Sequence, residues 1–106
     1  MPRSFKVSRP PKMRPPHPGA ILRLDVVPAM GISITQAARE LGVSRQLLHG
    51  ILAEKNQVSA GMAVRLGKWC GNGANIWIAL QRDRDLWEAE RRLSRAIADI
   101  PTRAAA

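Results

Sequence analysis

One short turn constrains the fold of this chain more than any other feature. The segment from Ile34 to Ala53 reads ITQAARELGVSRQLLHGILA. Ala38 is small, so the helix that contains it can press closely against a second helix. Gly42, four residues later, can adopt the positive φ that a tight turn between two helices requires. The pattern predicts two short helices at a fixed crossing, whose inward residues are Ala38, Gly42, Val43, Leu48 and Ile51.

The outer surface of the second helix is polar. Once the inward residues are set aside, its first turns present Ser44, Arg45, Gln46 and His49. This is the arrangement of a helix-turn-helix, in which the N-terminal part of the second helix enters the major groove of DNA. Arg45 is suited to guanine through O6 and N7, and Gln46 to adenine through N6 and N7. Gly50 leaves a gap on the same side. It either permits close approach to the groove or is a tolerated defect that costs ~1 kcal/mol relative to alanine.

Other polar residues are placed to hold the DNA backbone. Ser44, Thr35 and Gln36 lie near expected helix N-termini, where side chains and backbone N–H groups bind phosphates. Lys55 and Asn56 follow the second helix and are further candidates. The expected DNA-binding residues are therefore Thr35, Gln36, Ser44, Arg45, Gln46, His49, Lys55 and Asn56. Turns of this type also occur in helical bundles that never touch DNA.

The charge of the chain favours the DNA-binding interpretation. Its 106 residues include 17 basic and 8 acidic side chains, a formal net charge of +9. Residues 1–72 carry a net charge of +8, whereas residues 73–106 carry only +1. So large an excess on so short a chain indicates a polyanionic partner. We therefore expect double-stranded DNA as a partner of the first two thirds of the chain.

The residues of an enzyme site are missing from the sequence. It contains no spaced set of carboxylates, no His/Cys cluster and no phosphate-binding loop, and His17 and His49 are too isolated for a metal site. Cys70 is the only cysteine and lies in an apolar stretch, which is typical of a buried thiol in a reduced compartment. No stretch approaches the ~20 apolar residues of a membrane span. We expect no enzyme activity, no cofactor, no membrane partner and a cytoplasmic location.

The first 16 residues have a composition of their own. They contain five prolines, five basic residues and no acidic residue. Such a segment buries too little apolar surface to offset the entropy of ordering it, so a flexible arm is expected over residues 1–16. The arm is either a solvated leader or a segment that lies along phosphates or against a protein partner. It lacks the apolar run of a secretory signal.

Helical spacing and capping residues organise residues 17–100 into a single domain, followed by a frayed tail at 101–106. The expected helices run from Pro18 to about Met30, from the Ser33 cap to Leu41, from the Ser44 cap to about Ala53, from Ser59 to Cys70, and from Ala74 to Ala98. Ser33 followed three residues later by Gln36 is a capping-box signature. No strand pattern is present, so the fold class is all-α, with five helices.

The expected last helix carries two apolar sets that face different directions. Trp77, Leu80 and Trp87 are assigned to the core of the domain. The second set consists of Leu86, Leu93, Ile97 and Ile100, and it is the candidate interface of a homodimer, although it could equally pack on its own domain. Glu88 and Arg92 are spaced as a favourable i,i+4 ion pair on an exposed face.

Beyond the turn, the sequence resembles the HigA-type antitoxins, also called VapI-like, within the Cro and phage-repressor class. The matching stretches are His17-Pro18-Gly19, Ile21-Leu22, Gln36 to Arg45, Val58-Ser59, Met62-Ala63, Arg65-Leu66, Trp77, Leu80-Gln81 and Asp85 to Ala89. Together they span about residues 17–89. Membership implies a five-helix homodimer that binds a palindromic operator over its own promoter. It also implies a partner toxin, a small RelE- or HigB-like mRNA endonuclease that the antitoxin holds inactive.

Three positions depart from the pattern of that family. Ala20 replaces the acid that is common after His-Pro-Gly, Ala53 stands where asparagine is usual, and the basic arm is longer than typical. These departures concern the operator sequence and the toxin contacts rather than the fold. Two other functions remain open: a stand-alone transcriptional regulator without a toxin, and a protein-interaction module that does not bind DNA.

Overall fold

The computed structural model describes residues 13–103, and all regular elements in this range are helical. The first helical segment of the described range is continuous and consists of α1 (Pro18–Ile21), a π-helical turn (Leu22–Val26) and α2 (Val27–Met30). Pro28 lacks an N–H for the carbonyl four residues back, and its ring would clash with that carbonyl, which accounts for the widened turn before it. Gly31, at φ 67°, ends the segment.

Serine caps begin the next three helices of the fold. These helices are α3 (Ile34–Leu41), α4 (Arg45–Leu52) and α5 (Ala60–Cys70). Ser33, Ser44 and Ser59 each accept a hydrogen bond from the backbone N–H three residues later, at 3.0–3.1 Å. This bond satisfies one of the N–H groups that a helix start leaves without a partner. The all-α, helix-turn-helix prediction is confirmed.

The last helical segment is longer than the others but is not continuous. Helix α6 covers Ala74–Arg92 and the short α7 covers Ser94–Ala98, with Leu93 at φ −100° between them. The expectation of one helix from Ala74 to Ala98 is therefore wrong. Residues 90–100 are all exposed, so no packing supports a continuous helix there, and packing supplies most helical stability. The ion pair expected between Glu88 and Arg92 is also wrong, because Glu88 pairs with Arg84 instead.

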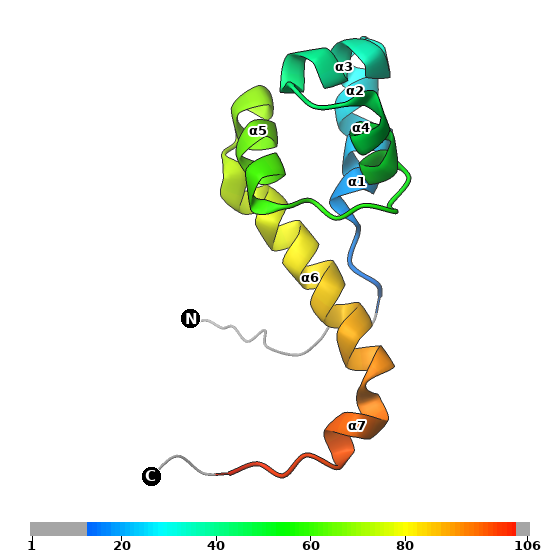
Figure 1. Cartoon of the computed structure of the whole chain (residues 1–106), viewed down its shortest axis with the longest axis vertical. Helices are drawn as coiled ribbons and strands as arrows, with labels where there is room; N and C mark the ends of the chain where they lie inside the picture. Colours follow the sequence, from blue (N-terminus) through cyan, green and yellow to red (C-terminus); the bar gives the residue numbers. More distant parts are fainter. Residues whose placement is uncertain (1–12, 104–106) are drawn as a thin grey trace, which may run out of the picture.

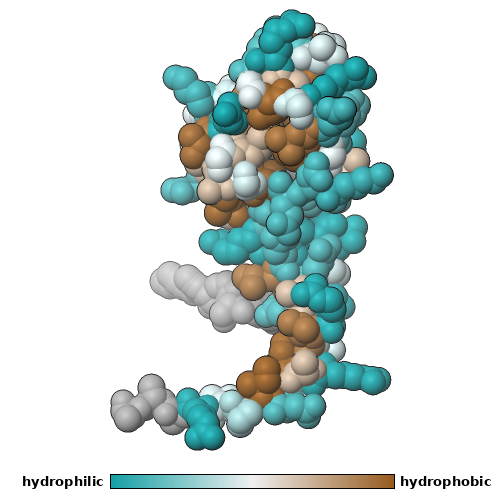
Figure 2. All heavy atoms as spheres, in the orientation of Figure 1, coloured by the Kyte–Doolittle hydropathy of each residue, from teal (hydrophilic) through white to brown (hydrophobic). Residues whose placement is uncertain are grey.

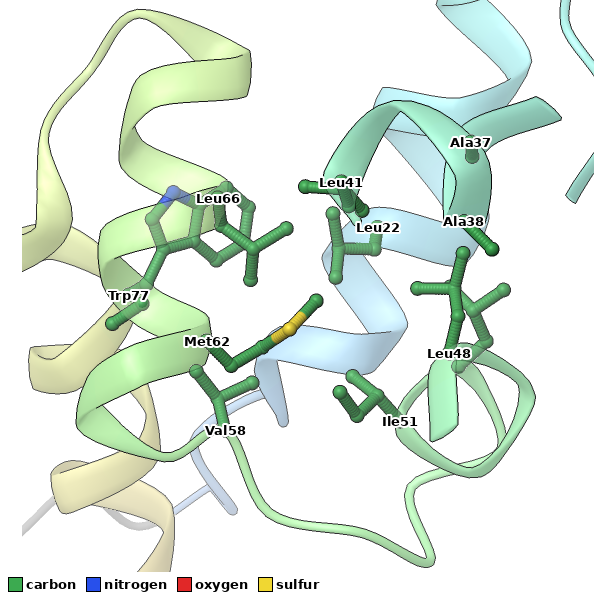
Figure 3. Packing of buried hydrophobic residues seen from close by; sticks show 12 residues of the cluster. Leu22, Ala37, Ala38, Leu41, Leu48, Ile51, Val58, Met62, Leu66 and Trp77 are labelled. Atoms are coloured by element: carbon green, nitrogen blue, oxygen red, sulfur yellow. The ribbon is translucent and has the colours of Figure 1, made fainter. Parts of the chain in front are cut away.

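The core lies where the first helical segment, α3, α4, α5 and the first half of α6 meet (Figure 3). Its buried apolar residues are Leu22, Ala37, Ala38, Leu41, Leu48, Ile51, Leu52, Val58, Met62, Ala63, Leu66 and Trp77. Apolar burial on this scale contributes roughly 25 cal/mol for each Å² removed from water, so it holds the five elements together. Trp87, which the sequence assigns to the core, lies half-buried outside this cluster, with the Arg91 guanidinium 4.0 Å from its ring centroid.

The molecule has a compact head and a narrow stem, with overall extents of 52 × 35 × 28 Å (Figure 1). We call residues 17–85 the head and residues 86–100 the stem. The stem is the second half of α6 together with α7, and it projects away from α3 and α4. Apolar side chains gather on its surface (Figure 2). The expected arm lies mostly outside the described residues, as does the end of the tail at 104–106.

Within the described range, no individual helix has both the length and the apolar content to cross a membrane. One bent pair, Pro18–Met30 with Ile34–Leu41, reaches that length and composition jointly, with a bend of 100°. Over residues 13–103, His, Cys, Asp and Glu side chains form no group of three or more that could hold a metal ion.

Candidate nucleic-acid interface

The turn between α3 and α4 has the geometry that the sequence pattern requires. Gly42 lies at φ 72°, and the N–H of Val43 donates to the carbonyl of Ala38 at 3.0 Å. From the next helix, Arg65 Nη1 donates to the carbonyl of Leu41 at 2.8 Å. A Cβ at Gly42 would come within 2.8 Å of the same guanidinium. The turn is therefore held from α5 as well as by its own backbone.

The inward residues lie in or against the core. Ala38, Leu48 and Ile51 are no more than 4 % exposed, and Val43 packs against the cluster while partly buried. This packing fixes the crossing of α3 and α4 (Figure 3). It also fixes which face of α4 remains outside.

The N-terminal half of α4 presents polar side chains to solvent. Arg45, Gln46 and His49 are exposed and together line a shallow depression. Ser44 is also exposed, but its Oγ accepts the hydrogen bond of the Leu47 N–H at 3.0 Å and serves as the cap of α4. Three side chains capable of hydrogen bonding thus share one face at the start of this helix. We call this set of Arg45, Gln46 and His49 the reading face.

Residues predicted to contact phosphate are placed less uniformly. Thr35 is exposed in the first turn of α3. Gln36 Nε2 donates to Glu40 Oε2 at 2.8 Å, and the Gln36 Oε1 accepts a hydrogen bond from Arg39. The Gln36 side chain is thus directed along its own helix, so only the Ser33 half of the expected capping box forms. A phosphate contact would require Gln36 to leave these partners.

The space that a side chain at Gly50 would need is occupied by Asn56. A Cβ at Gly50 would lie 1.9 Å from Asn56 Nδ2. The side chain of Asn56, predicted as a phosphate contact, is exposed and lies against Gly50, and the Asn56 N–H donates to the Gly50 carbonyl at 3.0 Å. Lys55 is exposed beside it. The gap at Gly50 is therefore filled by Asn56, which the sequence interpretation did not consider.

The C-terminal end of α4 is tied to two other helices. Arg23 donates to the carbonyl of Leu52, and its Nη2 lies 3.3 Å from Glu54 Oε2. Arg84 on α6 places Nη2 3.3 Å from Glu54 Oε1 and Nε 2.7 Å from Glu88 Oε2. We call Arg23, Glu54, Arg84 and Glu88 the anchoring cluster.

The anchoring cluster was missed by sequence reasoning. Arg84 is 7 % exposed and Gln81 is 5 % exposed, although both residue types are usually on the surface. Gln81 Oε1 accepts a hydrogen bond from the Val58 N–H at 2.8 Å. The spacing of Trp77, Gln81 and Arg84 on one helical face was the available signal, because a buried tryptophan marks the same face for its neighbours.

Known proteins with the same fold include DNA-binding antitoxins. No family model matches the sequence. The chain is 41 % identical to virulence-associated protein A′ of Dichelobacter nodosus over 73 residues, which cover 68 % of this chain and 63 % of that relative. The match thus spans slightly less than two thirds of that relative's length. Antitoxin GraA in complex with its operator has a TM-score of 0.80 and 39 % identity, over 89 % of this chain and 95 % of that one.

A further solved structure decides the family. Antitoxin HigA of Pseudomonas aeruginosa, with the higBA promoter, matches with a TM-score of 0.80 at 35 % identity, over 86 % of this chain and all of that one. The chain belongs to the HigA antitoxin family. The recognition from sequence motifs is thereby confirmed.

The His-Pro-Gly motif of this HigA-type chain begins α1 and packs it against the C-terminal end of α4. His17 Nδ1 accepts the hydrogen bond of the Gly19 N–H at 2.9 Å and caps α1, and Pro18 fills the first helical position. Gly19 lies so close to α4 that a Cβ would be 1.8 Å from the carbonyl oxygen of Ile51. Each motif residue thus has a distinct structural task.

Burial and the charges of the anchoring cluster shift several pKa values in the HigA-type chain. Burial opposes ionisation of Glu54, but the hydrogen bond from Arg23 and the charges of Arg84 and Arg23 outweigh it, so its pKa is lowered. The hydrogen bond from Arg84 lowers the pKa of Glu88. Burial lowers the pKa of His17 below 6.5, and burial raises the pKa of the Cys70 thiol. The cluster therefore holds ionised carboxylates beside a neutral histidine at neutral pH.

The stem of the HigA-type chain leaves apolar side chains uncovered. The residues predicted for a dimer interface are 43–66 % exposed: Leu86, Leu93, Ile97 and Ile100. The alternative that they pack on their own domain is wrong for residues 13–103, because all four side chains are exposed there.

Proposed function

We propose that this chain is the antitoxin of a bacterial toxin–antitoxin pair and that it represses its own operon by binding an operator. The observation that carries this proposal is the reading face, which stands exposed beside the Gly42 turn in a member of the HigA family. Antitoxin HigA and antitoxin GraA, both similar to this chain over most of its length, have been solved with promoter or operator DNA.

The reading face supplies the sequence-specific contacts in this proposal. The Arg45 guanidinium donates two hydrogen bonds to guanine, and the Gln46 amide pairs with adenine in the major groove. His49 adds a polar contact one turn further along α4. Thr35, Ser44 and Lys55 contact phosphates, which set the register but carry no sequence information. Gln36 would do so only after leaving Glu40 and Arg39, and the Asn56 side chain only after turning away from Gly50.

Two copies of the chain read a palindromic operator in this proposal. The exposed apolar residues of the stem are the surface that a second copy covers, because large exposed apolar patches mark interaction sites. A two-fold dimer then presents its two α4 helices to half-sites roughly 34–36 Å apart.

The cognate toxin in this proposal is a RelE- or HigB-like mRNA endonuclease, which the antitoxin binds and holds inactive. The antitoxin itself has no enzymatic activity and acts in the cytoplasm, where operator and toxin are found. Co-expression with the adjacent reading frame tests this part: a stable complex that restores growth is expected. If the adjacent product neither binds nor is toxic, the chain is a stand-alone regulator.

Operator binding is tested with the promoter fragment upstream of the gene at a series of salt concentrations. We expect a footprint on a palindrome, and an affinity that falls steeply with salt because cations are released from the phosphates. A scrambled fragment of equal length is the control. The proposal of repression fails if low-micromolar protein gives no footprint on the promoter, and the chain is then a protein-interaction module.

A further inference from the structure

The end of α4 differs from the ends of the other helices in the head. Gly31, Gly42 and Gly71 follow α2, α3 and α5, and all three have a φ between 67° and 79°. Glu54 is placed after α4 and has a φ of 63°. A side chain costs roughly 1–2 kcal/mol in this left-handed conformation, which glycine adopts freely. Glu54 therefore occupies a position whose left-handed backbone conformation favours glycine.

The Glu54 side chain joins two helices that approach α4 from different directions. Its Oε2 lies 3.3 Å from Arg23 Nη2, on the first helical segment. Its Oε1 lies 3.3 Å from Arg84 Nη2, on α6. Both carboxylate oxygens are thus engaged by guanidinium groups, which also keep the carboxylate ionised.

The Arg84 side chain, like that of Glu54, has all of its polar atoms engaged. It is 8 % exposed, and every nitrogen of its guanidinium has an acceptor. Nε donates to Glu88 at 2.7 Å, and Nη1 donates to the carbonyl of Pro15 at 3.2 Å. A planar guanidinium held at three points is a rigid connector. Helix α6 packs chiefly on α5, so this connector is a direct link from α6 to the end of α4.

We propose that Glu54 and Arg84 are positioning residues that set the angle between α4 and α6, and through it the half-site spacing that a dimer accepts. The inference rests on the proposed function, because α6 continues into the stem that a second copy covers. A tilt of about 7° over the ~28 Å length of α6 displaces its end by ~3.4 Å, one base-pair step. A loosened link therefore changes spacing before it changes base recognition.

The test compares operators in which one base pair is added or removed between the half-sites mapped by footprinting. Wild-type protein should lose about tenfold or more in affinity on either altered operator. Glu54→Gly should lose less than about threefold, because its α4 can tilt to meet the displaced half-site. Glycine suits the left-handed backbone, so the melting temperature of this variant should not fall by more than a few degrees. Asp25→Asn, exposed on the first helical segment of the head, removes one negative charge outside the stem and should behave as wild type.

A merely structural role for Glu54 predicts a different pattern. The variant would then melt earlier yet keep the wild-type preference for spacing, and this result overturns the inference. Equal wild-type binding to all three spacings also overturns it, while operator binding itself stands. If wild-type protein binds none of the fragments, the proposed function fails and the inference fails with it.

Discussion

The two ends of α4 are built in opposite ways. At the N-terminal end, Arg45 and Gln46 are exposed. At the C-terminal end, Leu52 and Glu54 are bonded to Arg23, Glu54 is also bonded to Arg84, and Gly19 abuts the carbonyl of Ile51. The helix has eight residues, about 12 Å in length, so both arrangements lie within one short element.

In the proposed function, the N-terminal end of α4 contacts DNA bases and the C-terminal end fixes the position of the helix. Arg45 and Gln46, which would contact bases in the proposed function, are exposed to solvent. The C-terminal end of the same helix is held by contacts to the first helical segment and to α6. Binding constellations act with defined geometry only when the elements that carry them are fixed. Substitutions at the two ends of α4 should therefore have different effects. Those at the N-terminal end should reduce base preference, and those at the C-terminal end should reduce stability or change the orientation of the helix.

The largest effect is expected where α1 abuts α4. In Gly19→Ala the added Cβ would meet a backbone carbonyl oxygen at 1.8 Å, which cannot move aside as a flexible side chain would. We expect a loss of at least about 3 kcal/mol in the free energy of unfolding, at the upper end for overpacking. Urea unfolding measures it. Gly61→Ala is the matched control, because its Cβ finds only Ser59 Oγ at 3.9 Å, and it should gain up to ~1 kcal/mol in helix propensity. Equal stability of the two variants would refute the close approach.

The next effect concerns the reading face. Arg45→Ala should weaken operator binding by about 1–3 kcal/mol and relax the preference at one base pair, without loss of stability. Lys55→Ala, just beyond α4, should instead lower the affinity for all DNA sequences equally. Competition binding with single-base operator variants measures the difference. If Arg45→Ala weakens every DNA equally, Arg45 contacts phosphate and is not a base reader.

A smaller effect is expected in the middle of α4. In Gly50→Ala the new Cβ displaces only the end of the Asn56 side chain, while the helix gains ~1 kcal/mol from alanine. We expect net changes within about 0.5 kcal/mol in both stability and operator affinity. Thermal melting and operator titration measure them. A tenfold loss of affinity with unchanged stability would instead show that the groove needs glycine here.

The smallest effect is a pH dependence from His17. Burial lowers its folded pKa below 6.5; Glu54, Asp85 and Glu88 oppose this shift, and Arg84 adds to it. Below 6.5 the unfolded chain therefore binds a proton that the folded chain does not, so stability falls on acidification until the folded pKa is reached. His17→Asn, which caps without titrating in this range, should flatten the profile of unfolding free energy above about pH 5. An unchanged profile would assign the dependence to other groups.

Local patterns predicted the reading end well and the anchoring end poorly. The serine caps and the Gly42 turn depend on residues three to five positions apart, so sequence spacing is enough to find them. The link between Glu54 and Arg84 joins residues 30 positions apart. The helical face that Arg84 shares with Trp77 hints that Arg84 is buried, but nothing local to it in the sequence indicates Glu54 as its partner. The break at Leu93 was missed for a related reason: helical spacing continues through it, but among residues 13–103 no other element packs against residues 90–100 to sustain the helix.

The proposed function requires that DNA contact the N-terminal half of α4. Titration of ¹⁵N-labelled protein with the promoter palindrome tests this directly through the amide chemical shifts. We predict the largest changes at residues 44–49, smaller changes at residue 35 and at residue 55, and little change at Glu54 and Arg84. If the largest changes lie along the stem and the amide signals of residues 44–49 do not shift, DNA does not meet this half of α4 and the proposed reading face is wrong.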